Sequence, residues 1–412
     1  MWENLSVSAQ VVLRHAPMSV TEISLDSADG STLDQMTKLF DPRSYRIDLT
    51  QAPLIRFAIA QNTDGTWIAV QLMHHIIGDH STMEVMAFEI DILLKSQDDS
   101  LLLAQPFRNL IAKTRSSASF ETHEQFFTNM LGEIDTPALP YGHFDVHNDD
   151  TEVHESQRVV AIDLNNRLRS HAKRMGVGLA SLCHLAWAQV ISRTSGQERV
   201  VFGTVLFGRM QGGSGTDQAM GLYINTLPLR IDVEGASVEE SVRQTQASLA
   251  ALLEHEHAPL AIAQRCSSIP AGSPVFSAML NCRHHSDASN NFSSIAGVVF
   301  HDEKQRTTFP FVMNVDDLGS GLSLTAQVVY PFEASRICAY MEQALHSLAD
   351  ALDWSPNMPV RKLEILPAEE REMLVKSWNT IESTFPDHHC IHNLFEDQVE
   401  QSPDSIAIVF QN

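Results

Sequence analysis

Apolar and polar residues alternate over short stretches of this chain, and elsewhere apolar residues recur over longer runs. Residues 67–73 alternate, with Ile68, Val70 and Leu72 on one face, which is typical of a strand. Residues 178–194 form a longer apolar run and predict a helix. Further strands are predicted at 10–13, 55–60, 156–163, 199–206, 220–230, 277–284, 309–315 and 322–330, and further helices at 83–95, 165–175, 237–257 and 335–352. The polar stretch at 115–157 is expected to connect two lobes.

Two adjacent histidines, His74 and His75, follow the predicted strand at 67–73 directly. Because adjacent side chains on a strand point to opposite faces, both histidines cannot easily serve one site. We expect one to face a cavity and the other to pack into the structure and hold the turn. Gly78 permits a tight backbone path, and Asp79 can fix the loop by hydrogen bonds or an ion pair.

A capping box predicts the start of the next helix. Ser81 can cap the first turn, and Glu84, three residues later, can reach back to the backbone. The apolar run from Met83 to Leu94 continues the helix. The histidines and the aspartate therefore lie where a strand turns into a helix.

A metal site is a competing interpretation, because His74, His75, Asp79 and His80 are all ligand types. Metal ligands must converge on one point, however, and an adjacent pair on a strand diverges. No HExxH or CxxC spacing supports a metal site. We expect no metal here, and most of the 19 histidines are expected to be surface or satisfied core residues.

Cys183 and His184 lie side by side inside the predicted helix at 178–194. A cysteine–histidine nucleophile pair needs both side chains in one site, whereas neighbours on a helix face different ways. Both are therefore expected to be core or helix-face residues.

Charge and cysteine content narrow the possible classes of protein. The net charge of the 412 residues is −23, from 28 basic and 51 acidic side chains, so we expect no binding to nucleic acid or to an anionic membrane. The 5 cysteines are scattered and odd in number, which argues against a disulfide framework and for a reducing compartment. The sequence has no long apolar run and no signal-peptide pattern, and a cytoplasmic location is expected.

Residues 73–79, Met-His-His-x-x-x-Asp, resemble the HHxxxDG signature of condensation domains in non-ribosomal peptide synthetases. The chain departs from it at His80, which replaces glycine. Residues 220–230 resemble the (I/V)GxFxNTLPLR motif of the same domains, with Tyr223 in place of the usual phenylalanine. The order of these motifs along the chain is more specific than either one alone.

The resemblance implies a two-lobed α/β (α+β) fold like that of chloramphenicol acetyltransferase. Each lobe is a mixed sheet flanked by helices, and an active-site tunnel runs between the lobes. The expected parts are an incomplete N-terminal lobe at 1–150, a C-terminal lobe at 151–352, a linker at 353–390 and the beginning of an adenylation domain at 391–412. Fewer residues precede the histidines than is usual in the family, so an N-terminal truncation is expected. Residues 392–410 look like the first helix and strand of an adenylation domain.

The resemblance also assigns roles to site residues. His75 is expected beside the attacking amine, as a general base or as a group that orients the amine or stabilises the intermediate. His74, Gly78, Asp79 and Arg209 are expected to support it. The partner expected for Asp79 is Arg209, with Arg56 as the competing partner.

His80, Ser81 and Asn225 are candidates for the substrate channel, and the Asn225 amide can fix either a backbone group or a substrate carbonyl. No cofactor is expected to bind directly. The substrates are expected on the 4'-phosphopantetheine arms of donor and acceptor carrier proteins, with an adenylation domain as neighbour. Two alternatives stay open: a non-catalytic or truncated module that only docks carrier proteins, and an acyltransferase of the same superfamily that uses coenzyme A.

Overall fold

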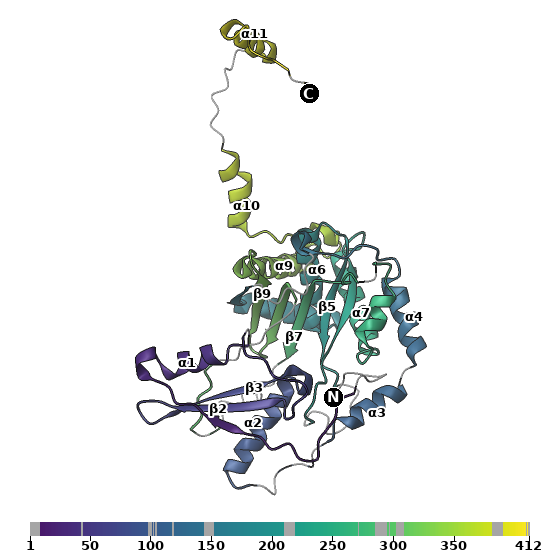
Figure 1. Ribbon diagram of the computed structural model, residues 1–412. Coiled ribbons are helices and arrows are strands. Elements are labelled where there is room, and N and C mark those ends of the chain that lie inside the picture. Colours follow the sequence, from purple (N-terminus) through teal and green to yellow (C-terminus); the bar gives the residue numbers. More distant parts are fainter. Residues whose placement is uncertain are drawn as a thin grey trace. The chain divides into compact units, whose positions relative to one another are not determined.

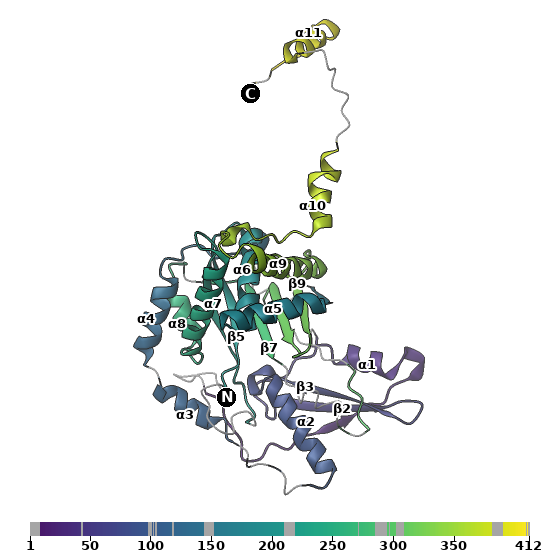
Figure 2. The ribbon, with the colours of Figure 1, turned by 180° about the vertical axis from the view of Figure 1, so that it is seen from behind.

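The computed structural model describes residues 9–42, 44–97, 101, 103, 105–117, 119–143, 152–209, 219–270, 272–284, 295, 297–301, 309–380, 390–408 and 410, without the side chains of 113–117. The chain divides into two compact units, Met1–Ile365 and Leu366–Asn412. The first unit contains two sheets, each with its own helices (Figures 1 and 2). We call these two parts the N-terminal and C-terminal lobes.

The N-terminal lobe is built on a 3-stranded sheet in the order β1-β2-β3. Its strands are β1 (Val20–Glu22), β2 (Ile55–Gln61) and β3 (Trp67–Met73). β1 is parallel to β2 and β2 is antiparallel to β3, so the sheet is mixed. α1 (Thr32–Leu39) buries Met36 against Ala58 and Ala60 of β2. α2 (His80–Leu94) follows β3 after a short 3-10 turn.

The C-terminal lobe is built on a 6-stranded sheet in the order β4-β9-β8-β7-β5-β6. The strands are β4 (Val153–Val159), β5 (Arg199–Leu206), β6 (Asn225–Asp232), β7 (Ala278–His284), β8 (Phe311–Asp317) and β9 (Leu322–Val329). β7 is parallel to both β5 and β8, and the other pairs are antiparallel. Both sheets are therefore mixed, as the family resemblance implied.

Helices from separate parts of the chain complete this lobe. They are α4 (Phe120–Leu131), α5 (Ile162–Met175), α6 (Leu179–Ser195), α7 (Val238–Leu253), α8 (Leu260–Arg265) and α9 (Ala334–Trp354). α3 (Arg108–Ser117) contacts the segment before β6, where its Leu110 packs against Ala219 and Tyr223. α6 and α9 pack on each other and on the strands of the sheet, and α5 packs on both (Figures 1 and 2). Trp187 of α6, Phe202 of β5 and Phe311 of β8 are fully buried in the resulting core.

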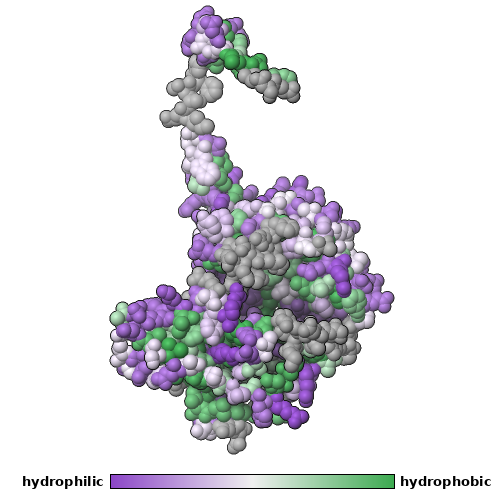
Figure 3. Space-filling model, in the orientation of Figure 1, coloured by the Kyte–Doolittle hydropathy of each residue, from purple (hydrophilic) through white to green (hydrophobic). Residues whose placement is uncertain are grey.

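On β7 and β8 the two faces of the sheet differ, because successive side chains point to opposite sides. On β7, Ala278 and Leu280 are fully buried, and Cys282 contacts Cys183 of α6. Asn281 points the other way and donates from Nδ2 to Oδ1 of Asn314 on β8, at 3.1 Å. Figure 3 shows the surface hollowed between the two lobes.

His184 of α6 is buried, as expected for a core residue. Its Nδ1 lies 2.6 Å from the carbonyl oxygen of Ala180, and its Nε2 lies 2.6 Å from Oγ1 of Thr204. Because a carbonyl only accepts, Nδ1 carries the proton in the neutral ring, and Nε2 accepts from the hydroxyl. Burial lowers the pKa of His184 to about 4.

This buried histidine predicts a loss of stability in acid. Between the usual pKa of about 6.5 and about 4, the unfolded chain binds a proton at His184 that the folded chain does not. The unfolding free energy should therefore fall by up to about 1.4 kcal/mol for each pH unit below 6.5. Urea unfolding at several pH values from 7.5 to 5 measures this effect. The unfolding free energy should fall less steeply with decreasing pH in His184→Leu than in the parent. An equal fall of the unfolding free energy in both proteins would contradict the lowered pKa of His184.

Most predicted elements are present, and β3 and β5 have the predicted ends. The strand predicted at 10–13 is wrong, because these residues form no regular structure and are exposed. Their β-branched composition alone does not create a strand without a partner. The strand predicted at 156–163 runs too far, since β4 ends at Val159 and α5 begins at Ile162, with Asp163 in its first turn.

The polar stretch at 115–157, predicted to be a connection, contains the helix α4. The buried residues of α4 are His123, Phe127 and Leu131, spaced four apart on one face. This face packs toward the C-terminal lobe: His123 Nδ1 lies 2.8 Å from His255 Nδ1. The sequence pattern did not predict this helix, because one of the three positions on its buried face is a histidine rather than an apolar residue.

The second unit contains α10 (Ala368–Val375) and α11 (Ile391–Gln401). The helix expected near 392 is therefore present, but the residues described after α11 include no strand. A single strand has no neighbour to pair with in this unit. Across the described residues, no single helix is long and apolar enough to cross a membrane; α5 and α6 pass that test only as a pair, bent by 113°.

Candidate active site

His74 holds the turn between β3 and α2. Its Nδ1 accepts the backbone N–H of Ile76 at 3.2 Å and so caps the 3-10 turn His75–Ile77. Desolvation lowers the pKa of His74, and the neighbouring charge of His75 lowers it further. The neutral form that accepts this hydrogen bond is therefore favoured.

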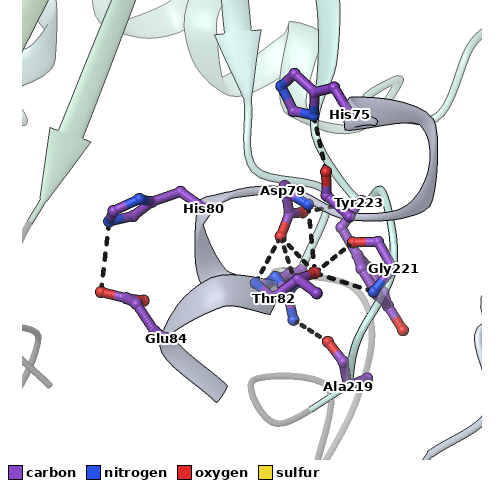
Figure 4. Close-up of polar contacts among 10 residues, drawn as sticks. His75, Asp79, His80, Thr82, Glu84, Ala219, Gly221 and Tyr223 are labelled. Carbon is purple, nitrogen blue, oxygen red and sulfur yellow. Dashed lines mark hydrogen bonds and ion pairs between the residues drawn. The ribbon is translucent and has the colours of Figure 1, made fainter. Parts of the chain in front are cut away.

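His75 is exposed at the start of the same turn. Its Nδ1 lies 2.8 Å from the carbonyl oxygen of Gly78 (Figure 4). Because a carbonyl oxygen can only accept, Nδ1 must carry the ring proton. The Nε2 atom of the neutral ring then keeps its lone pair, as a general base requires. His74 thus holds the turn, as the sequence predicted for one of the two histidines.

Asp79, rather than Ser81, is the N-cap of α2. Its Oδ1 accepts from the backbone N–H of Thr82 at 3.1 Å, and the Thr82 hydroxyl lies 3.3 Å from the backbone N–H of Asp79. The predicted cap at Ser81 is wrong by two residues. Aspartate is as good an N-cap residue as serine, and here the aspartate comes first in the chain. Asp79 therefore begins the helix.

Asp79 is 2% exposed, and its carboxylate is held from the C-terminal lobe. Oδ1 lies 3.0 Å from Nη2 of Arg209. Oδ2 accepts the backbone N–H of Tyr223 at 3.0 Å (Figure 4). The predicted pair of Asp79 and Arg209 is therefore present. Arg56, the competing partner, instead donates from Nη1 to the carbonyl oxygen of Pro53 at 2.5 Å.

The guanidinium of Arg209 is itself closely surrounded, with only 9% of its side chain exposed. Nη1 donates to the carbonyl oxygen of Ala219 at 2.9 Å, and the guanidinium carbon lies 4.2 Å from the ring centre of Tyr223. The Asp79 carboxylate stabilises this buried positive charge. Without the carboxylate, the charge would stay buried and uncompensated, which lowers the stability of the fold.

The segment Ala219–Tyr223 of the C-terminal lobe lies against the first turn of α2. The Thr82 hydroxyl accepts from Gly221 N at 3.1 Å and lies 3.0 Å from Gly221 O. Gly221 has a φ of +151°, and a Cβ there would lie 2.3 Å from Cδ2 of Phe107. The strand predicted at 220–230 begins only at Asn225, which pairs with Leu206, the last residue of β5.

Gly78 is needed for space rather than for its backbone conformation, since its φ of −174° is extended. A Cβ at Gly78 would lie 2.8 Å from Cγ2 and 2.9 Å from Cβ of Thr82. The first turn of α2 thus fits closely against the residue whose carbonyl holds His75.

Gly78→Ala is expected to lower the unfolding free energy by about 1–3 kcal/mol, because the new methyl group forces the turn away from Thr82. Thermal or urea unfolding measures this cost. Gly321→Ala is the matched control, since a Cβ there would meet nothing within 4 Å. Equal unfolding free energies of the two variants would show that the turn accommodates the added methyl group without cost.

The three channel candidates differ in their surroundings. His80 Nε2 lies 3.6 Å from Oε1 of Glu84, one turn further along α2. Ser81 is half-buried on the same turn. The Asn225 amide donates from Nδ2 to the carbonyl oxygens of Glu256 and Ala258, at 2.9 and 2.8 Å. Of the two uses expected for Asn225, the structure shows the backbone one.

Sequence reasoning missed Thr82 and the backbone N–H of Tyr223. Thr82 stands three residues after Asp79, the spacing of a capping box, and that signal was available. The Tyr223 amide carries no sequence signal, since every residue except proline has one. The described residues contain no group of three or more histidine, cysteine, aspartate or glutamate side chains that could hold a metal ion.

Comparison with known proteins identifies the family. The family profile described as Condensation domain matches residues 3–375. The chain belongs to the condensation-domain family. The HHxxxDG-like residues 74–79 and the Asn225-containing motif lie within the match, so the geometry described above is that of a condensation domain.

Two relatives of this condensation domain come from Mortierella alpina. Malpibaldin synthetase is 55% identical over 409 residues, covering 99% of this chain and 7% of the relative. Malpinin synthetase is 54% identical over 412 residues, covering 100% of this chain and 5% of the relative. The condensation domain thus spans a small part of the length of these synthetases.

A solved four-domain nonribosomal peptide synthetase, bound to AMP and glycine, shares the fold with a TM-score of 0.71. The match covers 95% of this chain and 31% of that one, at 15% identity. Likeness at this identity concerns the fold, which is the two-lobed α/β architecture of condensation domains.

Proposed function

We propose that this condensation domain joins two substrates, each held as a thioester on a carrier protein, by an amide bond. The observation that carries the proposal is the position of the His75 ring, whose Nδ1 lies against the carbonyl oxygen of Gly78. Its Nδ1 proton is held by Gly78 O at 2.8 Å, which leaves Nε2 as the basic atom of an exposed ring.

In the proposed reaction, the amine of the acceptor attacks the carbonyl carbon of the donor thioester. A C–N bond forms and the C–S bond breaks, and the donor carrier leaves as a thiol. His75 Nε2 accepts the proton that the attacking nitrogen loses and returns it to the departing sulfur. An imidazole suits both steps, because its neutral form accepts the proton and its protonated form gives the proton back.

The other residues would keep His75 in place. His74 and Gly78 shape the turn, and Asp79 with Arg209 anchors the start of α2. His80 and Ser81 stand on that first turn and remain candidates for contacts with substrate. The proposed tunnel would run through the hollow between the lobes (Figure 3).

The proposed partners are donor and acceptor carrier proteins with their 4'-phosphopantetheine arms, and an adenylation domain as neighbour. The high identity to segments of two synthetases supports this context. The net charge of −23 makes an extended nucleic-acid partner unsuitable. We also propose that the domain works in the cytoplasm.

The test is a two-carrier assay in which loaded donor and acceptor carrier proteins are mixed with the domain. Intact mass spectrometry detects the joined product on the acceptor carrier. The same donor is offered in parallel as its coenzyme A thioester. Product from the carrier-bound donor supports the proposal, product from coenzyme A alone supports the acyltransferase alternative, and no product across several substrate pairs supports the docking module.

A further inference from the structure

The Thr82 hydroxyl stands at a junction between the two lobes. Thr82 is 4% exposed and is the third residue of α2. Its Oγ1 lies 3.3 Å from Asp79 N and 3.1 Å from Asp79 Oδ1, both in the N-terminal lobe. The same atom lies 3.1 Å from Gly221 N and 3.0 Å from Gly221 O, in the C-terminal lobe (Figure 4).

A hydroxyl is the group that fits these neighbours. It has one proton to donate and lone pairs that accept two hydrogen bonds. Thr82 Oγ1 can accept from the amides of Asp79 and Gly221 while it donates to either Gly221 O or the Asp79 carboxylate. A side chain of the same shape without the oxygen would leave both amide groups without this acceptor.

The same side chain also touches the turn that carries His75. The Thr82 methyl and Cβ pack against Gly78, where an added Cβ would approach them to 2.8 and 2.9 Å. The carbonyl of Gly78 in turn accepts the Nδ1 proton of His75 at 2.8 Å. A shift of Thr82 is therefore passed to the atom that sets the tautomer and direction of the ring.

We propose that Thr82 is a positioning residue, whose hydroxyl fixes His75 relative to the C-terminal lobe. This inference rests on the proposed function of His75. Removal of the hydroxyl keeps the main hydrogen bond of the helix cap, because Asp79 Oδ1 still accepts the Thr82 amide. What is lost is the bridge from the catalytic turn to Gly221, not the helix.

The experiment compares Thr82→Val, which keeps the shape and removes the hydroxyl, with Thr82→Ser, which keeps the hydroxyl. Thr122→Val is the matched control, because Thr122 is also the third residue of a helix with a capping residue, Ser119, but is exposed and in α4. Steady-state kinetics are measured in the two-carrier assay. The ring tautomer of His75 is read from the 15N shifts of labelled histidine, assigned by their loss in His75→Asn.

Thr82→Val is expected to lower kcat by on the order of tenfold to a hundredfold, with little change in the KM for either carrier, because a small displacement of a catalytic group costs this much. The His75 spectrum should change from a single Nδ1–H tautomer to a mixture. Thr82→Ser should restore most of the turnover and the single tautomer, and Thr122→Val should match the parent in both.

An unchanged tautomer and an unchanged kcat in Thr82→Val would overturn the inference. A loss of kcat that Thr82→Ser does not restore would also overturn it, since the hydroxyl would not be the cause. The tautomer measurement needs no turnover, so it tests Thr82 even if the proposed function of His75 fails. Full turnover in His75→Asn would show that the proposed function of His75 is wrong.

Discussion

His75→Ala is expected to lower the rate of amide formation by about 10²- to 10⁴-fold, the usual contribution of a general acid–base group. The ring is exposed and its hydrogen bond to Gly78 O can be replaced by water, so the fold should survive. Single-turnover measurement in the two-carrier assay gives the rate of the chemical step. Circular dichroism and thermal unfolding verify that the variant is folded.

His75→Asn separates the two nitrogens of the ring. The asparagine Nδ2 can replace Nδ1 as donor to Gly78 O, but no basic atom replaces Nε2. We therefore expect His75→Asn to be as slow as His75→Ala and as stable as the parent. Near-normal turnover of either variant would refute the role of His75 as base, and a rate in His75→Asn well above that of His75→Ala would indicate a role in shaping the turn.

Asp79→Ala is expected to act mainly on stability, with a cost of about 3–5 kcal/mol, because the guanidinium of Arg209 is then buried without its carboxylate. Tyr223 N and Thr82 N lose their acceptor as well. Urea unfolding measures the change in unfolding free energy. Asp79→Ala with Arg209→Ala should cost less than the sum of the two single changes, since the second change removes the uncompensated charge.

The exposed pair of Arg243 and Glu239 is a matched control. These side chains are 55% and 41% exposed, against 9% and 1% for Arg209 and Asp79. Glu239→Gln should change the unfolding free energy by no more than about 0.5 kcal/mol, as is usual for exposed ion pairs. Unchanged stability of Asp79→Ala, together with lost activity, would instead place Asp79 in the chemistry.

The parts of the fold that depend on local pattern could be predicted from the sequence. Alternation gave the ends of β3 correctly, and the apolar run after Gly178 gave α6. Motif resemblance added the pair of Asp79 and Arg209, which local pattern could not supply. The start of α2 was missed because two possible caps, Asp79 and Ser81, stand close together, and burial of Asp79 decides between them.

The features of the site that the sequence did not predict depend on contacts between distant parts of the chain. The Tyr223 amide, which holds Asp79, is 144 positions away and has no side-chain signature. Asn225 offers two uses by its chemistry, and only the position of the turn at Glu256–Ala258 selects the backbone one. Buried polar groups choose partners by where the fold brings them, which a local pattern does not encode.

The contacts of Gly221 have a consequence for exchanging lobes between related domains. In sequence, Gly221 and Arg209 belong to the second lobe, but they complete the first turn of α2 in the first lobe. A chimera that takes each lobe from a different parent would therefore combine one parent's Asp79 with the other parent's arginine and glycine. Such hybrids should be more stable when the two parents agree at these positions than when they differ there, so these residues can be compared before any hybrid is made.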